Sequence, residues 1–452
     1  MRVLYVAAEA APIVKVGGLG DVAGSLPPAL KRLGVDIRVA IPWYPEIDAL
    51  RWKVSENKGI GETRLGDTDV PVYLLSRDVF ANTGVHQAIV GTDEEERWFG
   101  GFCDAIIEFI KGSEWKPEVF HGNDWHVAQA LEHFEKAKPE ELRSWGYASS
   151  NLASLVTIHN LSYHTEVLRR AILSADLINA VSPSYAREIL TEEFCEGLCA
   201  ELRERKDDLS GVINGIDYDF WDPAKDAFIS TQYGGENWME GKKRNKEALV
   251  ATLGFSANDR LLLGFVGRLD PHQKGVLVLA GAIERLVNMG CQVVILGSGN
   301  AKAEKTLQRV CERHPESSRA LLKYDEDLAH QIYAGADALL IPSRFEPCGL
   351  IQMIAMKYGT LPIAHAVGGL KDTIQDGKNG ILYENYDSSA FVQAVERAYR
   401  MFTDQGSQWG NMVQSAMKAD FSWDRSAQEY VKLYERALEK SKNTHSMSLR
   451  HI

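Results

Sequence analysis

The sequence predicts an α/β protein with two doubly wound domains, each built on a parallel sheet. Short apolar runs alternate with segments of helical spacing from residue 2 onward, which is typical of a parallel sheet with helices on both faces. The rhythm breaks at residues 214–223, which read NGIDYDFWDP, and a second alternating series then begins. We therefore expect a first Rossmann-like domain at 1–218, a second at 219–420, and a C-terminal helix with a frayed tail at 421–452.

The individual elements follow from apolar spacing. The first strand resembles the core of a signal peptide, but Glu9 cuts the apolar run short and no cleavage site follows. The last helix has apolar residues over nearly half its circumference, whereas the polar residues from Lys440 onward predict fraying. The predicted strands are 2–8, 37–41, 70–75, 119–121, 155–158, 177–181, 211–213, 261–267, 293–297, 320–324, 338–341 and 361–367; the predicted helices are 21–33, 98–110, one after His126, one after Gly275, 301–313, 328–335, one from Leu350 and 423–438.

The net charge of the chain argues against two classes of partner, and its cysteines indicate the redox state of its compartment. The chain has 50 Lys and Arg against 62 Asp and Glu, a net charge of -12, which argues against nucleic acid or an anionic membrane as a partner. The six cysteines show no CxxC pair and no disulfide-framework spacing. We therefore expect free thiols in a reducing cytoplasm. The sequence does not indicate an oligomeric state.

A strand, a loop and a helix are predicted around residues 340–353, LIPSRFEPCGLIQM. The amides of Cys348, Gly349 and Leu350 precede the helix, where N–H donors and the helix dipole favour an anion such as phosphate. Glu346 cannot hold a phosphate, but its carboxylate suits the hydroxyls of an attached sugar. The alternative is that Glu346 is an ordinary acid at the start of a helix.

The glycine-rich loop Lys15–Asp21 lies between the first strand and the first helix. Its spacing is neither G-x-G-x-x-G nor that of a P-loop, and no acidic residue ends the second strand, which argues against a dinucleotide site. Lys15 beside the loop amides favours an anion. The alternative is a tight turn without a ligand.

Polar clusters follow two predicted strands of the first domain, at His121–His126 and at 157–160. A metal site formed by His121, Asp124, His126 and His159 is one interpretation. Because no H-x-x-x-H or HExxH spacing is present, we favour hydrogen-bonded residues without a metal.

Two cations follow the first strand of the second domain. Arg268 and Lys274 could neutralise a diphosphate, with bidentate contacts from Arg and a point charge from Lys. A surface pair is the alternative. Tyr324, expected at a strand end, could stack on a nucleobase or close the core.

Four motifs together resemble one family. Lys15–Asp21 is similar to K-T-G-G-L-G-D, with Val16 in place of threonine, and His121–His126 is similar to H-x-x-D-W-H. The run 343–350 is similar to S-R-F-E-P-C-G-L and the run 368–370 to G-G-L. In this order they resemble the glycogen and starch synthase family of retaining glycosyltransferases (glycosyltransferase family 5), from residue 1 to about residue 438.

The resemblance implies a GT-B fold, in which two Rossmann-like domains face each other across a deep cleft and the C-terminal helix crosses back onto the first domain. It implies transfer of glucose from ADP-glucose, or from UDP-glucose, to the non-reducing end of an α-1,4-glucan or maltooligosaccharide, without a metal or other cofactor. Only sixteen residues separate Asn160 from Leu177, and this short segment would suit a small or oligosaccharide acceptor. A glucan-binding protein that has lost turnover is a further alternative.

Roles for single residues are also implied by the resemblance. Glu346 would hold the sugar, His159 would lie beside it, and Arg268 and Lys274 would stabilise the departing nucleoside diphosphate, so that these four are the expected catalytic residues. The expected substrate-binding residues are Lys15, Gly17, Gly18, Asp21, Glu9, Asp124, Asn214, Tyr324, Cys348, Gly349 and Leu350.

Overall fold

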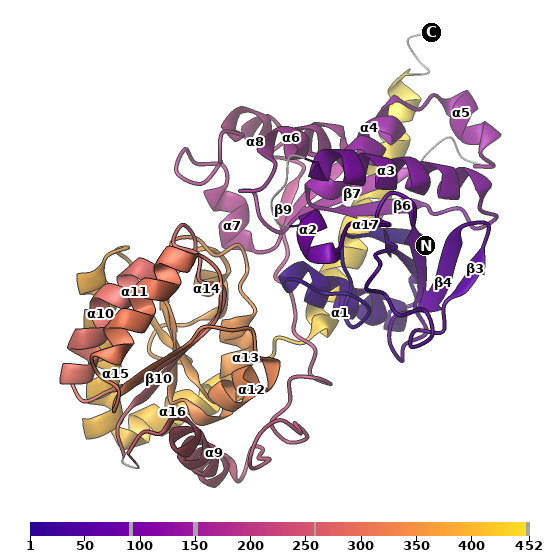
Figure 1. Ribbon diagram of the computed structural model, residues 1–452. Coiled ribbons are helices and arrows are strands. Elements are labelled where there is room, and N and C mark those ends of the chain that lie inside the picture. The colour runs from indigo at the N-terminus through magenta and orange to yellow at the C-terminus, as the bar shows by residue number, and fades with distance from the viewer. Residues whose placement is uncertain (90–93, 148–151, 257–258, 449–452) are drawn as a thin grey trace. The chain divides into compact units, whose positions relative to one another are not determined.

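The computed structural model describes residues 1–89, 94–147, 152–256 and 259–448, and the chain divides into two compact units (Figure 1). Unit 1 comprises Met1–Ile216 together with Ser422–Ile452, and unit 2 comprises Asp217–Phe421. The boundaries expected after residues 218 and 420 lie beside these breaks. Each unit is described by itself.

Unit 1 is built on a sheet whose described strands run in the order β3-β4-β5-β2-β1-β6-β7-β8-β9. The strands from β5 to β9 pair in parallel, whereas β3 and β4 form an antiparallel edge. The strand order reverses between β1 and β6, where doubly wound sheets bind ligands. The strands are β1 Arg2–Val6, β2 Asp36–Pro42, β3 Ser55–Asn57, β4 Ile60–Arg64, β5 Pro71–Leu75, β6 Val119–Asn123, β7 Ala153–Ile158, β8 Leu177–Ala180 and β9 Leu209–Gly211.

Helices pack around this sheet because their apolar faces are buried; α1, for example, buries Val22, Leu26 and Leu30. The described helices of unit 1 are α1 Gly18–Arg32, α2 Val85–Ile89, α3 Glu95–Gly112, α4 Ala128–Lys136, α5 Pro139–Ser144, α6 Thr165–Ser174, α7 Pro183–Glu188, α8 Cys199–Glu204 and α17 Trp423–Ser448, with a 3-10 turn η1 at Trp125–Val127.

The C-terminal helix α17 packs on the sheet of unit 1 through two buried tyrosines. The Asn179 amide of β8 donates to the Tyr430 hydroxyl over 3.0 Å, and His121 Nδ1 of β6 lies 2.8 Å from the Tyr434 hydroxyl. Both tyrosines are fully buried. The fraying expected from Lys440 onward is corrected for residues 440–448, because the helix continues to Ser448 and Lys440 donates to the Asp176 carbonyl over 2.9 Å; the rest of that expectation, at 449–452, lies outside the described residues.

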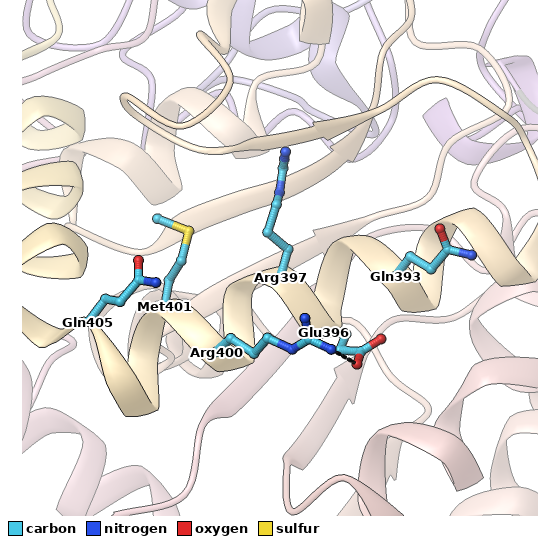
Figure 2. A pocket seen from close by; sticks show the side chains of 6 residues that line it. All are labelled: Gln393, Glu396, Arg397, Arg400, Met401 and Gln405. Carbon is cyan, nitrogen blue, oxygen red and sulfur yellow. Dashed lines mark hydrogen bonds and ion pairs between the residues drawn. The ribbon is translucent and has the colours of Figure 1, made fainter.

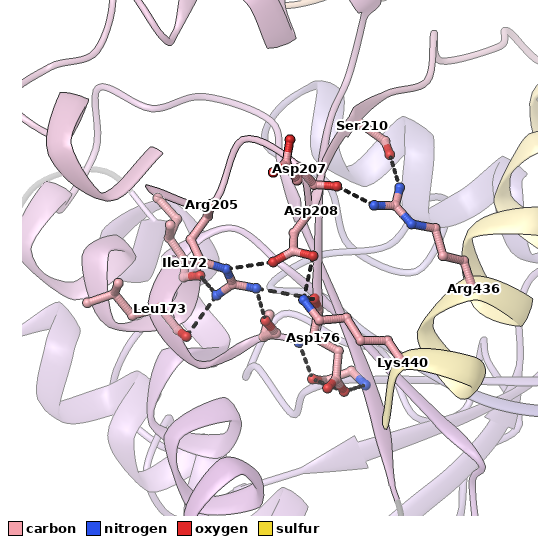
Figure 3. A network of polar contacts seen from close by, with 11 residues as sticks. Ile172, Leu173, Asp176, Arg205, Asp207, Asp208, Ser210, Arg436 and Lys440 are labelled. Atoms are coloured by element: carbon pink, nitrogen blue, oxygen red, sulfur yellow. Dashed lines mark hydrogen bonds and ion pairs between the residues drawn. The ribbon is translucent and has the colours of Figure 1, made fainter. Parts of the chain in front are cut away.

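A polar network joins α6, β9 and α17 (Figure 3). The Arg205 guanidinium donates to the carbonyls of Ile172 and Leu173, over 2.6 and 2.8 Å, at the C-terminal end of α6. It also donates to the Asp208 carboxylate over 2.9 Å, and Lys440 pairs with the same carboxylate. Burial alone would raise the pKa of Asp208, but hydrogen bonds from Lys440 and Arg205 outweigh it and hold that pKa below its ordinary value.

We expect Arg205→Ala to lower the free energy of unfolding by about 2–4 kcal/mol, because it removes the donor of several partly buried carbonyls and leaves Asp208 with Lys440 alone. Chemical denaturation followed by circular dichroism measures this loss. Lys432→Ala removes an exposed pair with Glu429 and serves as the control, with an expected change below about 0.5 kcal/mol. Equal losses in the two variants would contradict the interpretation.

Unit 2 contains a parallel sheet with the described strands in the order β12-β11-β10-β13-β14-β15. Numbered along the chain, this is the doubly wound order 3-2-1-4-5-6, which reverses between β10 and β13. The strands are β10 Leu262–Val266, β11 Gln292–Leu296, β12 Ser318–Leu321, β13 Ala338–Ile341, β14 Leu361–His365 and β15 Ile381–Tyr383; the described helices are α9 Trp238–Leu253, α10 Val276–Asn288, α11 Ala301–Glu312, α12 Glu326–Gly335, α13 Ile351–Lys357, α14 Gly368–Thr373, α15 Ser388–Asp404 and α16 Gly406–Lys418.

Three sequence-based expectations are corrected by the structure. Tyr324 is not at a strand end, since β12 stops at Leu321. The strand expected at 211–213 lies at Leu209–Gly211 instead. Cys195 and Cys199 form a disulfide, although no disulfide was expected. Within the described residues, no helix combines the length and the apolar character needed to cross a membrane.

Candidate functional site

The switch point of unit 2 brings Lys274 and Glu346 together. Lys274 follows β10 and Glu346 follows β13, the two strands between which the order reverses. Lys274 Nζ lies 2.9 Å from Glu346 Oε1 and 2.7 Å from Oε2, and the Ser343 hydroxyl donates to Oε2 over 2.9 Å. Only 4% of Glu346 is exposed, and α13 begins five residues later at Ile351. Glu346 is therefore not the ordinary acid at a helix start that we considered as an alternative.

Close backbone contacts hold the two loops in this arrangement. Gly275 has a φ of +64°, and a Cβ atom there would lie 1.8 Å from the Pro342 carbonyl oxygen, so only glycine fits. The Arg344 amide donates to the Gln273 carbonyl over 2.8 Å. The loop after β10 is thus fixed against the loop after β13 on either side of Lys274.

Arg268 occupies the same loop as Lys274 but at its surface. Its side chain donates to the Gln273 side-chain oxygen over 3.2 Å, and the residue is exposed, whereas Gln273 is buried. The switch point thus combines an exposed guanidinium with an ammonium–carboxylate pair whose side chains are only 17% and 5% exposed. An exposed guanidinium can make bidentate contacts with a diphosphate.

Residues 348–350 form a tight turn before α13. Gly349 has a φ of +70°, and the Gln352 amide donates to the carbonyls of Cys348 and Gly349 over 3.0 and 2.9 Å. Leu350 is the N-cap residue of α13. The anion-binding role of this turn stays a prediction.

Tyr324 is 75% exposed, so it does not close the core, which leaves base stacking as the remaining interpretation.

In unit 1, Glu9 binds the glycine-rich loop from within. The carboxylate accepts hydrogen bonds from the amides of Val16, Gly17 and Gly20, the last over 3.0 Å. Only 2% of Glu9 is exposed. The Gly17 amide therefore contacts an internal carboxylate, which corrects the expectation that it faces a phosphate; sequence reasoning placed Glu9 near the substrate but missed this contact.

The two charged residues that bound this loop, Lys15 and Asp21, form an ion pair that is more exposed than Glu9. Lys15 Nζ lies 2.7 Å from Asp21 Oδ1, and each side chain is about one third exposed. Gly18 is the first residue of α1. The phosphate-binding roles of Lys15 and Gly18 stay predictions, because this part of the loop faces solvent.

The stability of the protein should fall as pH rises because of Glu9. Burial outweighs the amide hydrogen bonds and raises the pKa of Glu9 from 4.5 to about 7. The folded state therefore binds a proton more tightly than the unfolded state, and this contribution is present below pH 4.5 and lost as pH rises through 7. The loss is ~3 kcal/mol.

Urea denaturation at pH 5 and at pH 8 measures this contribution. Glu9→Gln should reduce the difference between the two pH values, whereas replacement of the exposed Glu114 by Gln should leave it unchanged. An unchanged pH dependence in Glu9→Gln would contradict the assignment.

Asp124 and His159 contact each other in unit 1, where they follow β6 and β7 respectively. Both lie on the β6 side of the switch point between β1 and β6, whereas the glycine-rich loop lies on the β1 side. Asp124 has a φ of +54°, and its Oδ1 accepts from the His159 amide over 2.6 Å. Burial raises the pKa of Asp124 to about 7 and lowers the pKa of His159 to about 3. His159 is therefore neutral at physiological pH.

Asn123 fixes the tautomer of His159, which sequence reasoning missed. The Asn123 amide donates to the Val6 carbonyl over 2.8 Å, so its oxygen faces His159 Nε2 at 2.9 Å. The Tyr5 hydroxyl donates to the same oxygen over 3.0 Å. Nε2 must then carry the proton, which makes Nδ1 the hydrogen-bond acceptor of this ring.

The other two histidines of the polar clusters, His121 and His126, are buried and make contacts with neighbouring side chains of unit 1. His121 lies between the Tyr434 and Thr157 hydroxyls, each at 2.8 Å, and His126 stacks on Trp125. Over the described part of the chain, the one group of three metal-ligating side chains with ligand atoms within 4.8 Å of one another is Glu192, Cys195 and Cys199.

Asn214 lies just beyond β9 and is almost fully buried. Its side-chain oxygen has no hydrogen-bond partner in the structure. A buried polar atom without a partner is costly. Its predicted contact with substrate would supply the missing donor.

A surface depression along α15 is lined by Gln393, Glu396, Arg397, Arg400, Met401 and Gln405 (Figure 2). Its arginines are paired with carboxylates, Arg397 with Asp376 and Arg400 with Glu396. A helix that follows a parallel strand runs back toward the amino end of the sheet. The depression is therefore separate from the loops after β10 and β13.

Two family models match the chain. Residues 2–167 and 164–204 match the starch synthase catalytic domain, and residues 260–401 match the glycosyl transferases group 1. The glycogen synthase of Geotalea daltonii is 35% identical over 489 residues, covering 97% of this chain and 99% of that protein. The glycogen synthase of Thermotoga maritima is 35% identical over 493 residues with the same coverage.

Solved structures agree with these matches. The catalytic domain of starch synthase IV from Arabidopsis thaliana, bound to ADP and acarbose, has a TM-score of 0.87 and 31% identity, covering 97% of this chain and 99% of that one. Sucrose-phosphate synthase from Thermosynechococcus elongatus has a TM-score of 0.65 at 17% identity and covers 97% of this chain. The second likeness concerns the fold alone.

Proposed function

The chain belongs to the glycogen and starch synthase family of GT-B glycosyltransferases, and from that premise we propose that it transfers glucose from ADP-glucose to the non-reducing 4-hydroxyl of an α-1,4-glucan. The observation that carries the proposal is the buried Lys274–Glu346 pair at the switch point of unit 2. The related starch synthase IV was solved with ADP and acarbose, which supports an adenine nucleotide and a glucan-like ligand here.

The Lys274–Glu346 pair suits a nucleotide sugar because both charged groups are largely withdrawn from water, with 17% of the Lys274 side chain and 5% of the Glu346 side chain exposed. Breaking the bond between sugar and diphosphate places positive charge on the sugar and negative charge on the leaving group. We assign Lys274 and Arg268 to the diphosphate, and Glu346 to the sugar hydroxyls. When the nucleotide sugar binds, Lys274 leaves the Glu346 carboxylate and contacts the diphosphate instead. Glu346 then accepts hydrogen bonds from the sugar hydroxyls in place of those from the Lys274 ammonium. Because the two cations supply the positive charge, the proposal needs no metal or other cofactor.

In unit 1, His159 is assigned to the sugar as a neutral hydrogen-bond acceptor. Its Nε2 proton is directed to Asn123, so Nδ1 can accept from a sugar hydroxyl. Asp124 positions it by accepting from the His159 amide. Neither residue then carries a full charge beside a cation-like sugar, which leaves the diphosphate contacts as the main electrostatic contribution.

A smaller acceptor is the second candidate. α6 begins at Thr165, only five residues after Asn160, so little chain follows His159 on the side assigned to the acceptor. A short maltooligosaccharide would suit this short segment. The third candidate, a glucan-binding protein without turnover, is disfavoured because Lys274, Glu346 and Ser343 retain a connected, buried arrangement.

We further propose a cytoplasmic location. Four of the six cysteines are free, buried thiols, as expected for a chain that folds in a reducing compartment.

Release of nucleoside diphosphate tests the proposed function. ADP-glucose and UDP-glucose are each incubated with glycogen, with maltotriose or without acceptor. The expected result is release from ADP-glucose that depends on glycogen. Release with maltotriose alone would move the function to the second candidate, and no release from either donor would overturn both.

A further inference from the structure

We propose that Cys195 and Cys199 form a reversible disulfide that controls the position of the segment following His159. The two residues are bonded in the structure, whereas the other four cysteines are buried free thiols. Cys199 is half-buried, and the residues beside the pair, Glu196, Gly197 and Ala200, are exposed. An external thiol can therefore reach this disulfide, which thiol–disulfide exchange requires.

The disulfide closes a tight turn with an unfavourable backbone. Glu196 has a φ of +47° and Gly197 a φ of +83°, and the Leu198 amide donates to the Cys195 carbonyl over 2.8 Å. Glycine adopts such angles readily, but glutamate rarely does. The disulfide joins the residues before and after the turn, Cys195 and Cys199, and so holds Glu196 in this conformation. Once the bridge opens, Glu196 can return to an ordinary backbone conformation.

Glu196 connects this turn to the candidate site. The Ser162 hydroxyl donates to Glu196 Oε1 over 3.4 Å, and the Leu161 amide donates to the Tyr185 hydroxyl over 3.0 Å. At its other end, the segment is held by the hydrogen bond from the His159 amide to Asp124. Residues 159–162 are thus held by Asp124 at His159, by Tyr185 of α7 at Leu161 and by Glu196 of the disulfide turn at Ser162. Opening the bridge frees Glu196 and so loosens the last of these three contacts.

The chemistry is an ordinary exchange with an external dithiol. One thiolate of the dithiol attacks Sγ of Cys199, the bond between the two cysteine sulfurs breaks, and the Cys195 thiolate leaves and takes up a proton. The second thiolate of the dithiol then displaces Cys199, which also becomes a thiol after protonation, and the dithiol becomes a disulfide. Two electrons and two protons move to the protein. A small-molecule disulfide carries out the reverse reaction.

Hydrogen exchange tests the proposal independently of activity. The full chain is compared before and after dithiothreitol treatment, with thiols counted by alkylation. We expect two additional thiols and ~10-fold faster amide exchange in peptides covering 159–162 after reduction. Cys195→Ser/Cys199→Ser should show the fast exchange with or without dithiothreitol. Ser162→Ala is the matched variant: it should show fast exchange while its disulfide remains intact.

The effect on catalysis rests on the proposed function. We expect reduction to raise the KM for glycogen several-fold and to leave the KM for ADP-glucose unchanged. No gain of two thiols, or unchanged exchange at 159–162 after reduction, would overturn the redox proposal. If neither redox state turned over any donor, the proposed function would fail, while the exchange result would still decide the redox proposal.

Discussion

Glu346→Gln and Lys274→Met should each lower kcat for glucose transfer at least ~100-fold. Each substitution removes one member of the buried pair, and with it a contact that we assign to the sugar or to the diphosphate. Steady-state ADP release with saturating glycogen measures the effect. Circular dichroism should show that both variants are folded.

Lys246→Met provides the matched control for these two variants. Lys246 forms a similarly buried pair with Asp337 in unit 2, with an N–O distance of 2.6 Å, but Asp337 precedes β13 and so lies at the opposite end of the sheet from Glu346. We expect this control to lose stability and to keep kcat within ~3-fold. If all three variants kept normal turnover, the site assignment would be wrong.

His159→Ala should lower kcat ~100-fold, because it removes a preorganised hydrogen-bond partner of the sugar. Asn123→Leu should have a smaller effect, ~10-fold, because the ring remains but its tautomer is no longer fixed. The pH profile separates these roles: burial holds the pKa of His159 near 3, so the wild type should show no loss of kcat from its protonation above pH 5.

His126→Phe is the control for the histidine series. This side chain is buried and stacked on Trp125, and its Nε2 has no hydrogen-bond partner, so an aromatic ring of similar size should keep kcat within ~3-fold. Equal losses in His126→Phe and His159→Ala would mean that the effect is structural rather than catalytic.

The alternating apolar pattern was sufficient to predict the two doubly wound sheets, because buried parallel strands are apolar along their whole length. It failed where elements are polar or short. The β3–β4 edge escaped prediction because β3 is fully exposed, and α9 was missed because buried polar residues such as Lys242 and Asn245 weaken its apolar spacing.

The candidate site residues were proposed from sequence, but most of the contacts that they make in the structure could not be predicted in this way. Lys274 and Glu346 were assigned to the diphosphate and to the sugar, yet their pairing depends on β10 lying beside β13, which is a property of strand order. Glu9 lies seven residues before Val16, and only the folded loop shows that its carboxylate receives the loop amides. The disulfide was missed because a spacing of four residues is compatible with many structures.

The most direct test of glucan synthesis is the chain-length distribution of glycogen after incubation with ADP-glucose and the wild-type protein, measured by debranching the product. The proposal predicts longer outer chains, with one glucose added for each ADP released. Release of ADP without any lengthening of the outer chains would contradict it.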